Sequence, residues 1–271
     1  MPTQRISFEG HDGSTLAARL DLPDGPRLAT ALFAHCFTCG KDIAAARRIS
    51  QRLTSMGIAV LRFDFTGLGH SDGEFANTTF TSNVEDLVRA ARHLADTGHA
   101  PELLIGHSLG GAAILKAAGQ IASAKAVVAI AAPFDPAHVE HNFADALDEI
   151  ARRGEAEVTL GQRPFTIRRQ FVEDIEATSL GPAIRELRRA LLILHAPRDE
   201  SVGIENAARI FTAARHPKSF VTLDDSDHLV SRAEDAEYAA EVIAAWLTRY
   251  VTLTPPAPPP MMSVHQILPL R

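Results

Sequence analysis

Residues 102–111 read Glu-Leu-Leu-Ile-Gly-His-Ser-Leu-Gly-Gly and predict a strand that enters a helix through a sharp turn. Three apolar residues, Leu103 to Ile105, lead into the turn, and an alanine-rich helical pattern follows it. A Gly-x-Ser-x-Gly pentapeptide in this setting is typical of a nucleophile elbow, where glycines keep side chains out of a crowded turn. The pattern therefore predicts that Ser108 presents its hydroxyl at the tip of a buried strand.

Composition and charge narrow the classes of function. The 271 residues are 46% hydrophobic and 22% charged, which is enough apolar material for a sizeable core. A net charge of −6 offers no electrostatic reason to bind nucleic acid or an anionic membrane. The N-terminus lacks the apolar segment of a signal peptide, and no apolar run is long enough to insert into a membrane. We therefore expect a cytoplasmic globular protein that acts on a small molecule.

Strand and helix patterns alternate along most of the chain. Residues 4–9 and 15–22 flank an Asp-Gly turn and predict an N-terminal antiparallel hairpin. The continuous apolar run of residues 28–34 indicates a strand buried on both faces of a parallel sheet. The alternation predicts a doubly wound, mostly parallel α/β sheet with an antiparallel N-terminal edge. Further strands are predicted at residues 59–65, 103–105, 126–132, 190–195 and 219–223, with helices at 43–56, 82–97, 204–214 and 235–250.

The alternation breaks at about residues 135–189. Helical patterns at 137–152 and 170–177 enclose a small predicted hairpin of residues 158–160 and 165–167. We interpret this segment as a compact cap over the strand tips, with Phe165 and Phe171 as walls of a substrate pocket. The alternative is an ordinary long connection without substrate contact.

The chain is expected to form one domain over residues 1–251. The run Pro-Pro-Ala-Pro-Pro-Pro after Thr254 cannot continue a helix or a sheet. Residues 252–271 are therefore predicted to be a proline-rich linker and a C-terminal tail.

Three polar residues follow three predicted strands, where ligands bind in an open α/β sheet: Ser108, Asp199 and His228. A serine hydroxyl becomes a useful nucleophile when an imidazole removes its proton, and a carboxylate orients that imidazole. Serine, then acid, then histidine is the chain order of one class of hydrolases. We therefore predict a catalytic triad of these residues.

Other residues compete for two of these roles. Asp224, Asp225 and Asp227 are closer in sequence to His228, but an orienting carboxylate normally follows the preceding strand, so we interpret them as loop-capping residues. His107 is expected to pack beneath the elbow without a part in catalysis.

Acyl transfer also requires donors for a developing oxyanion. The residue after the nucleophile supplies one amide, here that of Leu109. The loop after the strand at 28–34 should supply the other, from Phe37 or alternatively Cys36. His35 is predicted to lie in the substrate pocket beside them.

The two cysteines, Cys36 and Cys39, form a Cys-x-x-Cys motif. A redox or metal role would need a helix start or a second pair of ligands, and neither is evident. Whether they form a disulfide is left open. The glycine-rich loop at 66–73 lacks the lysine of a phosphate-binding loop and is interpreted as structural. No metal or cofactor is predicted.

These motifs resemble those of the α/β-hydrolase superfamily over residues 6–251. The resemblance rests on His35-Cys36-Phe37, Asp64-Phe65-Thr66-Gly67-Leu68-Gly69-His70-Ser71, the pentapeptide around Ser108, Asp199-Glu200-Ser201-Val202 and Asp227-His228. It implies an eight-stranded sheet. Residues 35–42 are similar to the hydrolase half of bacterial proteins fused to an OsmC-like peroxide-reducing domain, which would begin beyond the proline-rich run. Cys36 departs from the glycine that many relatives carry.

The motifs together predict a carboxylesterase that cleaves short-chain acyl esters through an acyl-enzyme intermediate at Ser108. Two alternatives use the same fold: a thioesterase or cofactor-free perhydrolase with the same triad, and a binding module without activity. The expected partner is a small-molecule ester, and assembly into a homo-oligomer is left open.

Overall fold

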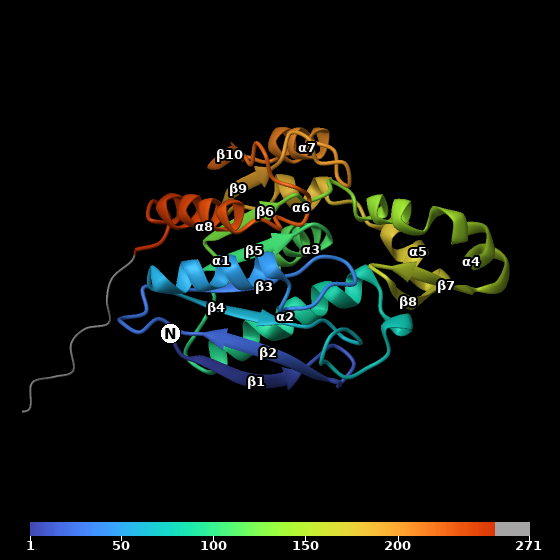
Figure 1. Ribbon diagram of the computed structural model, residues 1–271, viewed down its shortest axis with the longest axis horizontal. Helices are drawn as coiled ribbons and strands as arrows, with labels where there is room; N and C mark the ends of the chain where they lie inside the picture. The colour runs from blue at the N-terminus through green and yellow to red at the C-terminus, as the bar shows by residue number, and fades with distance from the viewer. Residues whose placement is uncertain (253–271) are drawn as a thin grey trace, which may run out of the picture.

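An eight-stranded sheet runs between two layers of helices in the computed structural model, which describes residues 1–252 (Figure 1). Its strands are β1 (Thr3–Glu9), β2 (Thr15–Asp21), β3 (Ala29–Ala34), β4 (Ile58–Phe63), β5 (Leu103–His107), β6 (Ala126–Ile130), β9 (Ala190–His195) and β10 (Lys218–Thr222). The strand order is β1-β2-β4-β3-β5-β6-β9-β10. Strand β2 is antiparallel to both of its neighbours, β1 and β4, and all the other neighbouring pairs in this sheet are parallel. The predicted mostly parallel sheet with an antiparallel N-terminal edge is therefore confirmed.

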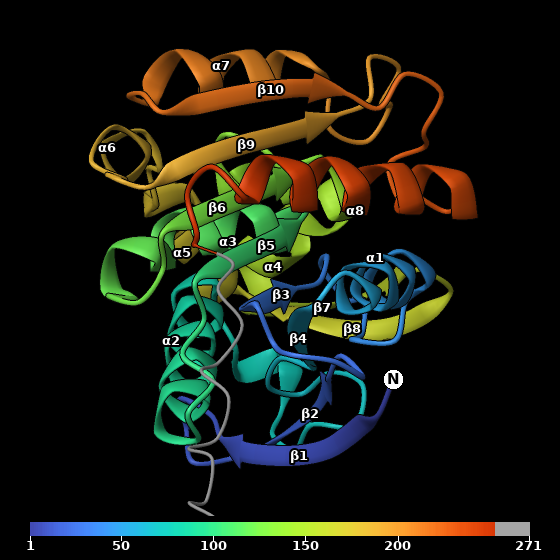
Figure 2. The ribbon, with the colours of Figure 1, turned by 90° about the vertical axis from the view of Figure 1, so that its left-hand side faces the viewer.

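Successive side chains of the central strands enter two separate hydrophobic cores. In β3, for example, Leu32 packs with the core on one face and Phe33 with the core on the other. The two cores are covered by different helices, as Figure 2 shows in an end-on view of the layers. One layer holds α1 (Ala44–Ser55) and α8 (Ala233–Leu247), and the other holds α2 (Phe80–Asp96), α3 (Leu109–Ala117) and α7 (Glu205–Ala213).

The topology brings the candidate residues to one edge of the sheet. From β3 the chain crosses to β4 on one side and later returns to β5 on the other side of β3. Ligands bind in open α/β sheets at such a change of direction, beyond the carboxyl ends of the strands. Phe37 and Ser108 follow the two strands that flank this point.

The segment between β6 and β9 forms a lobe at one end of the sheet (Figure 1). Residues 137–152 do not form the single helix that was predicted, because Phe143 has non-helical backbone angles and its ring is buried in the core. The hairpin is longer than predicted, with Gly161 and Gln162 at positive φ in its two-residue turn. The elements are η3 (Pro136–Ala146), α4 (Leu147–Arg153), β7 (Glu155–Leu160), β8 (Arg163–Arg168), α5 (Arg169–Ala177) and α6 (Gly181–Arg185).

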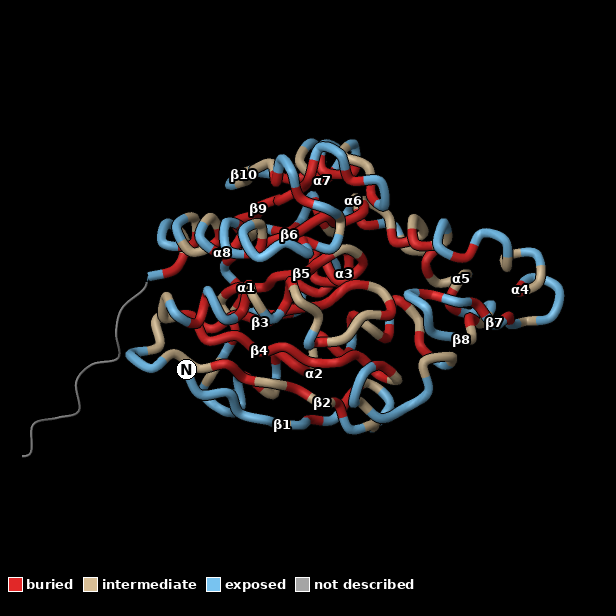
Figure 3. Tube along the Cα trace, in the orientation of Figure 1, coloured by how far each residue is buried: buried red, intermediate tan, exposed pale blue. Residues whose placement is uncertain are grey.

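Burial follows the same plan. The strands at the centre of the sheet are buried along their length, whereas the outer surfaces of the helices and of the lobe are exposed (Figure 3). Across residues 1–252 no helix is both long and apolar enough to cross a membrane. The predicted linker and tail lie outside the described residues except for Thr252.

Candidate active site

Ser108 lies at the turn between β5 and α3 with a φ of 55° and a ψ of −125°. Few residues other than glycine adopt a positive φ, so the backbone here is strained. A Cβ added at Gly106 would lie 2.4 Å from the Gly110 carbonyl oxygen, and one added at Gly110 would lie 2.3 Å from that of His35. The two glycines of the pentapeptide are therefore required by the close approach of backbone segments around the serine.

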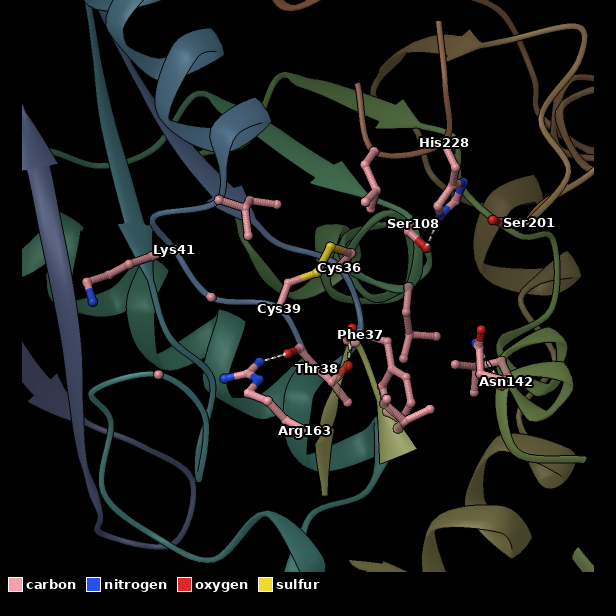
Figure 4. Close-up of a pocket in the computed structure, with 18 of the residues that line it drawn as sticks. Cys36, Phe37, Thr38, Cys39, Lys41, Ser108, Asn142, Arg163, Ser201 and His228 are labelled. Atoms are coloured by element: carbon pink, nitrogen blue, oxygen red, sulfur yellow. Dashed lines mark hydrogen bonds between the residues drawn. A yellow bond between two sulfur atoms is a disulfide. The ribbon is translucent and has the colours of Figure 1, made fainter. Parts of the chain in front are cut away.

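The hydroxyl of Ser108 is hydrogen-bonded to the His228 ring (Figure 4), and that ring is hydrogen-bonded in turn to the Asp199 carboxylate. Ser108 Oγ lies 3.0 Å from His228 Nε2, and His228 Nδ1 lies 2.8 Å from Asp199 Oδ2. Because a carboxylate only accepts, Nδ1 carries the proton of the neutral imidazole. Nε2 is then free to accept the serine proton. The structure brings together the three residues that the sequence singled out from three separate strand ends.

The Asp199 carboxylate is held in its ionised form. Burial acts to raise the pKa of Asp199, but hydrogen bonds from His228 and from the amides of Val202 and Ser201 outweigh it, so the pKa falls below its ordinary value. These amides donate to Asp199 Oδ1 over 2.8 and 2.9 Å. The loop is anchored in turn by buried His195, whose Nε2 donates to the Val202 carbonyl over 2.7 Å.

His107 supports the loop that carries His228. Its Nε2 lies 2.7 Å from the backbone carbonyl oxygen of His228, and since a carbonyl only accepts, Nε2 carries the proton. Burial, together with the smaller effect of nearby His228, lowers the pKa of His107 to about 4, so the ring is neutral at pH 7. The sequence predicted that His107 packs beneath the elbow, but it did not predict this hydrogen bond, which joins residues 121 positions apart in the sequence.

Two backbone amides near Ser108 are available to a ligand. Among the hydrogen bonds of residues 1–252, none uses the amide of Phe37 or Leu109 as a donor. Leu109 is the first residue of α3, where amides have no acceptor within the helix. Both residues line the same cavity as Ser108, and their role as oxyanion donors stays a prediction.

The loop that contains Phe37 is closed by a disulfide between Cys36 and Cys39, whose Cα atoms are 5.3 Å apart. The sequence had left this pairing open. Thr38, between Phe37 and Cys39, has a φ of 56°, and its hydroxyl donates a hydrogen bond to the Phe37 carbonyl over 2.8 Å. His35 donates from Nδ1 to the Cys36 carbonyl over 2.8 Å.

A buried ion pair anchors the far end of this loop. Lys41 Nζ lies 2.6 Å from Asp64 Oδ2, and the Lys41 amide donates to Asp64 Oδ1 over 2.6 Å. Burial acts to raise the pKa of Asp64, but its hydrogen bonds with Lys41 and with the His70 amide outweigh it and lower the pKa. Sequence reasoning did not find this pair, because neither residue belongs to a catalytic motif.

A cavity of about 680 Å³ opens beside Ser108. The cap contributes the hairpin tip around Gly161 and part of η3, including Asn142 (Figure 4). The other lining residues come mainly from the loop after β3, with further ones from the loops after β4, β5, β6, β9 and β10. The lining residues include Cys36, Phe37, Cys39, Ser108, Leu109, Val139, Leu160, Arg163, Val202 and His228.

Three predicted pocket residues do not line this cavity. Phe171 instead stacks on Phe37, with ring centroids 5.4 Å apart, and Phe165 packs on Phe75 at 5.0 Å. They form an aromatic cluster behind the cavity because the hairpin packs on the short 3-10 helix η1 (Phe75–Asn77) and α5 packs on α2 and η3. His35 is 1% exposed, and its ring donates a hydrogen bond to the Cys36 carbonyl.

Arg163, at the start of β8, connects the cap to the disulfide loop. Its guanidinium donates to the Thr38 carbonyl, a contact between residues 125 positions apart in the sequence (Figure 4). The guanidinium carbon also lies 5.3 Å from the centre of the Phe165 ring, within range of a cation–π interaction. Sequence reasoning missed Arg163 because nothing local to the hairpin indicates its partner.

Comparison with known proteins places these observations in a family. The model of a family described as alpha/beta hydrolase matches residues 31–245. The esterase domain of a Rhodothermus marinus protein is 52% identical with a TM-score of 0.76, over 92% of this chain and 99% of that one. The mouse palmitoyl-protein thioesterase ABHD10, a mitochondrial protein, is 28% identical over 212 residues, which cover 74% of this chain and 69% of that protein.

A more distant relative covers slightly more of the chain. The uncharacterised protein YfhR of Salmonella typhi is 23% identical over 230 residues, or 83% of this chain and 74% of that protein. The family match spans most of the sheet and all three hydrogen-bonded residues of the site. This chain therefore belongs to the alpha/beta hydrolase family.

Proposed function

We propose that the protein is a serine esterase that hydrolyses short-chain carboxylic esters through an acyl-enzyme intermediate. The observation that carries this proposal is the hydrogen-bonded series Ser108, His228 and Asp199, which opens into a cavity with the amides of Phe37 and Leu109. The Rhodothermus marinus esterase domain, at 52% identity, supports the same class of reaction.

Each group has a defined role in this reaction. Ser108 Oγ attacks the ester carbonyl carbon while its proton moves to His228 Nε2. The amides of Phe37 and Leu109 donate to the oxyanion, with the Cys36 amide as the alternative to that of Phe37. His228 then gives the proton to the departing alkoxide, and Asp199 stabilises the imidazolium throughout. A water molecule, deprotonated by His228, finally releases the acid from Ser108.

The shape of the site favours a short acyl group. Behind Phe37, the packing of Phe65 and Phe75 leaves a void of only about 10 Å³, which is roughly the space of one water molecule. An acyl chain that enters beside Phe37 therefore cannot extend into the core. A longer chain would have to turn back along the open side of the 680 Å³ cavity.

Thioester hydrolysis is the second candidate. The mouse relative is called a palmitoyl-protein thioesterase, and it is 28% identical over most of this chain. The same triad attacks a thioester carbonyl in the same way, with a thiolate as the leaving group. The two candidates differ in the leaving group and in the length of the acyl chain.

A matched substrate panel tests the proposal. Turnover of p-nitrophenyl acetate, butyrate, octanoate and palmitate is compared with that of thioesters of the same acids. We expect the acetate and butyrate esters to be hydrolysed fastest, and Ser108→Ala to abolish turnover. Ser55→Ala, an exposed serine on α1, is the control for the same chemical change outside the site. A preference for palmitoyl thioesters would favour the second candidate.

A further inference from the structure

The Cys36–Cys39 disulfide closes the turn that contains Phe37, a residue that lines the cavity beside Ser108. Phe37 and Thr38 are the two central residues of this turn, and the Cys39 amide donates to the Cys36 carbonyl over 3.2 Å across its base. The turn is therefore closed by both a covalent bond and a hydrogen bond.

The direction of the Phe37 amide depends on this turn. A trans peptide is planar, so the N–H of Phe37 points opposite to the C=O of Cys36. That carbonyl accepts hydrogen bonds from His35 and from the Cys39 amide on the side away from the Phe37 N–H. If the turn opens, the Cys39 contact is lost and the peptide between Cys36 and Phe37 can rotate.

The turn needs such a restraint because of the residue at its second central position. Thr38 has a φ of 56°, a region that suits glycine or asparagine and that a β-branched residue resists. Once the covalent closure is removed, Thr38 is expected to return towards a negative φ. The remaining contacts, from His35 to the Cys36 carbonyl, from the Thr38 hydroxyl and from Arg163, each involve a single hydrogen bond.

The disulfide is also within reach of a reagent. Both cysteines line the cavity beside Ser108, and Cys39 is half-buried whereas Cys36 is 4% exposed (Figure 4). A thiolate that enters the cavity can therefore attack the disulfide without unfolding of the sheet. Disulfides exposed in this way are the ones that exchange readily with thiols.

We propose that Cys36 and Cys39 are positioning residues, that their disulfide directs the Phe37 amide towards Ser108, and that reduction of this bond slows acyl transfer. The inference rests on the proposed function of Ser108. In the reduction a dithiol supplies two electrons and two protons, becomes a disulfide itself and leaves two thiols on the protein. The sequence predicts a cytoplasmic location, and cellular thiols are kept reduced in the cytoplasm. The activity would then depend on the ratio of reduced to oxidised thiols around the protein.

The test compares the oxidised and reduced protein directly. The chain has only two cysteines, so a thiol titration after anaerobic treatment with dithiothreitol reports the state of this one bond. Loss of one oxyanion donor costs about 10²–10³ in kcat, and we expect kcat on p-nitrophenyl acetate to fall by at least about tenfold with little change in KM. Reoxidation should restore kcat.

Two controls separate positioning from folding. The double variant Cys36→Ser, Cys39→Ser should match the reduced protein in kcat and should not respond to dithiothreitol, while its circular dichroism spectrum stays that of the folded protein. A trifluoromethyl ketone, which forms an oxyanion adduct with serine, should bind the reduced protein more weakly by about the same factor as the fall in kcat.

The rate at which a fluorophosphonate labels Ser108 gives a readout that does not depend on the substrate. Slower labelling of the reduced protein supports the inference. Equal labelling rates and an unchanged kcat in protein with two free thiols would overturn it. If labelling differs but neither state hydrolyses an ester, the proposed substrate class is wrong and the inference about the disulfide still holds.

Discussion

The His107 ring donates a hydrogen bond from Nε2 to the backbone carbonyl oxygen of His228 over 2.7 Å. The residue that precedes the candidate nucleophile thus holds the loop that carries the candidate base. Because His107 is buried and its pKa is about 4, this donor is unchanged in charge across the neutral range. The distance between Ser108 Oγ and His228 Nε2 therefore depends on a hydrogen bond in which neither of these two side chains takes part.

Replacement of His107 should separate this contact from simple packing. We expect His107→Leu to lower kcat by about 10²-fold, since displacement of a reacting group by about 1 Å has that effect. His107→Gln should keep most of the activity because its side-chain amide can place an N–H near the position of Nε2. Steady-state kinetics on both variants checks this, and equal losses would contradict the positioning role.

The buried histidines should make stability depend on pH. Burial lowers the pKa of His107, and also those of His35 and His195. Between the ordinary pKa of about 6.5 and the folded value, the unfolded chain takes up protons that the folded chain does not, so stability falls as the pH falls through this window. For His107, whose pKa in the folded protein is about 4, the loss is about 3 kcal/mol.

Urea unfolding at pH values from 7 to about 4 measures this effect. The free energy of unfolding of His107→Gln should decline less steeply than that of the wild type over the same window. Asp64 and Asp199, whose pKa values are lowered, contribute stability that is lost only at still lower pH. Parallel curves for the two proteins would contradict this account, because they would show that His107 has the same pKa in the folded and the unfolded chain.

Arg163 should affect both turnover and stability. Its guanidinium holds the Thr38 carbonyl from the cap, and one such hydrogen bond is worth about 1 kcal/mol, so Arg163→Ala should lower kcat by up to about fivefold. Arg153→Ala is the matched control, because this cap arginine pairs with Glu149 of its own helix. The free energy of unfolding should fall by up to about 1 kcal/mol in Arg163→Ala and by less than about 0.5 kcal/mol in Arg153→Ala. Equal kinetics for the two variants would show that the cap contact is passive.

The sequence predicted the parts of the site that follow strand ends. Ser108, Asp199 and His228 each come after a strand with a recognisable apolar pattern, and parallel strands bring their carboxyl ends to one edge. The order of residues along the chain was therefore enough to foresee that their side chains meet. The Phe37 loop followed from the same reasoning.

The supporting contacts could not be predicted in this way. His107 with His228, Lys41 with Asp64, and Arg163 with Thr38 are pairs from distant elements, and no local pattern specifies them. The cap role of residues 135–189 stays a prediction, and the aromatic residues of this segment pack behind the cavity because the hairpin packs on η1 and α5 packs on α2 and η3. Short apolar segments such as Phe165 and Phe171 look the same in sequence whether they face a substrate or a core.

The central claim is that Ser108 carries the acyl group during turnover. Intact-mass spectrometry of protein quenched during hydrolysis of p-nitrophenyl acetate, followed by peptide mapping, tests it directly. We expect one added acetyl group, located on Ser108 and absent from Ser108→Ala, which should also lose turnover. An acetyl group on another residue that turns over at the rate of catalysis, or unchanged hydrolysis by Ser108→Ala, would contradict the claim.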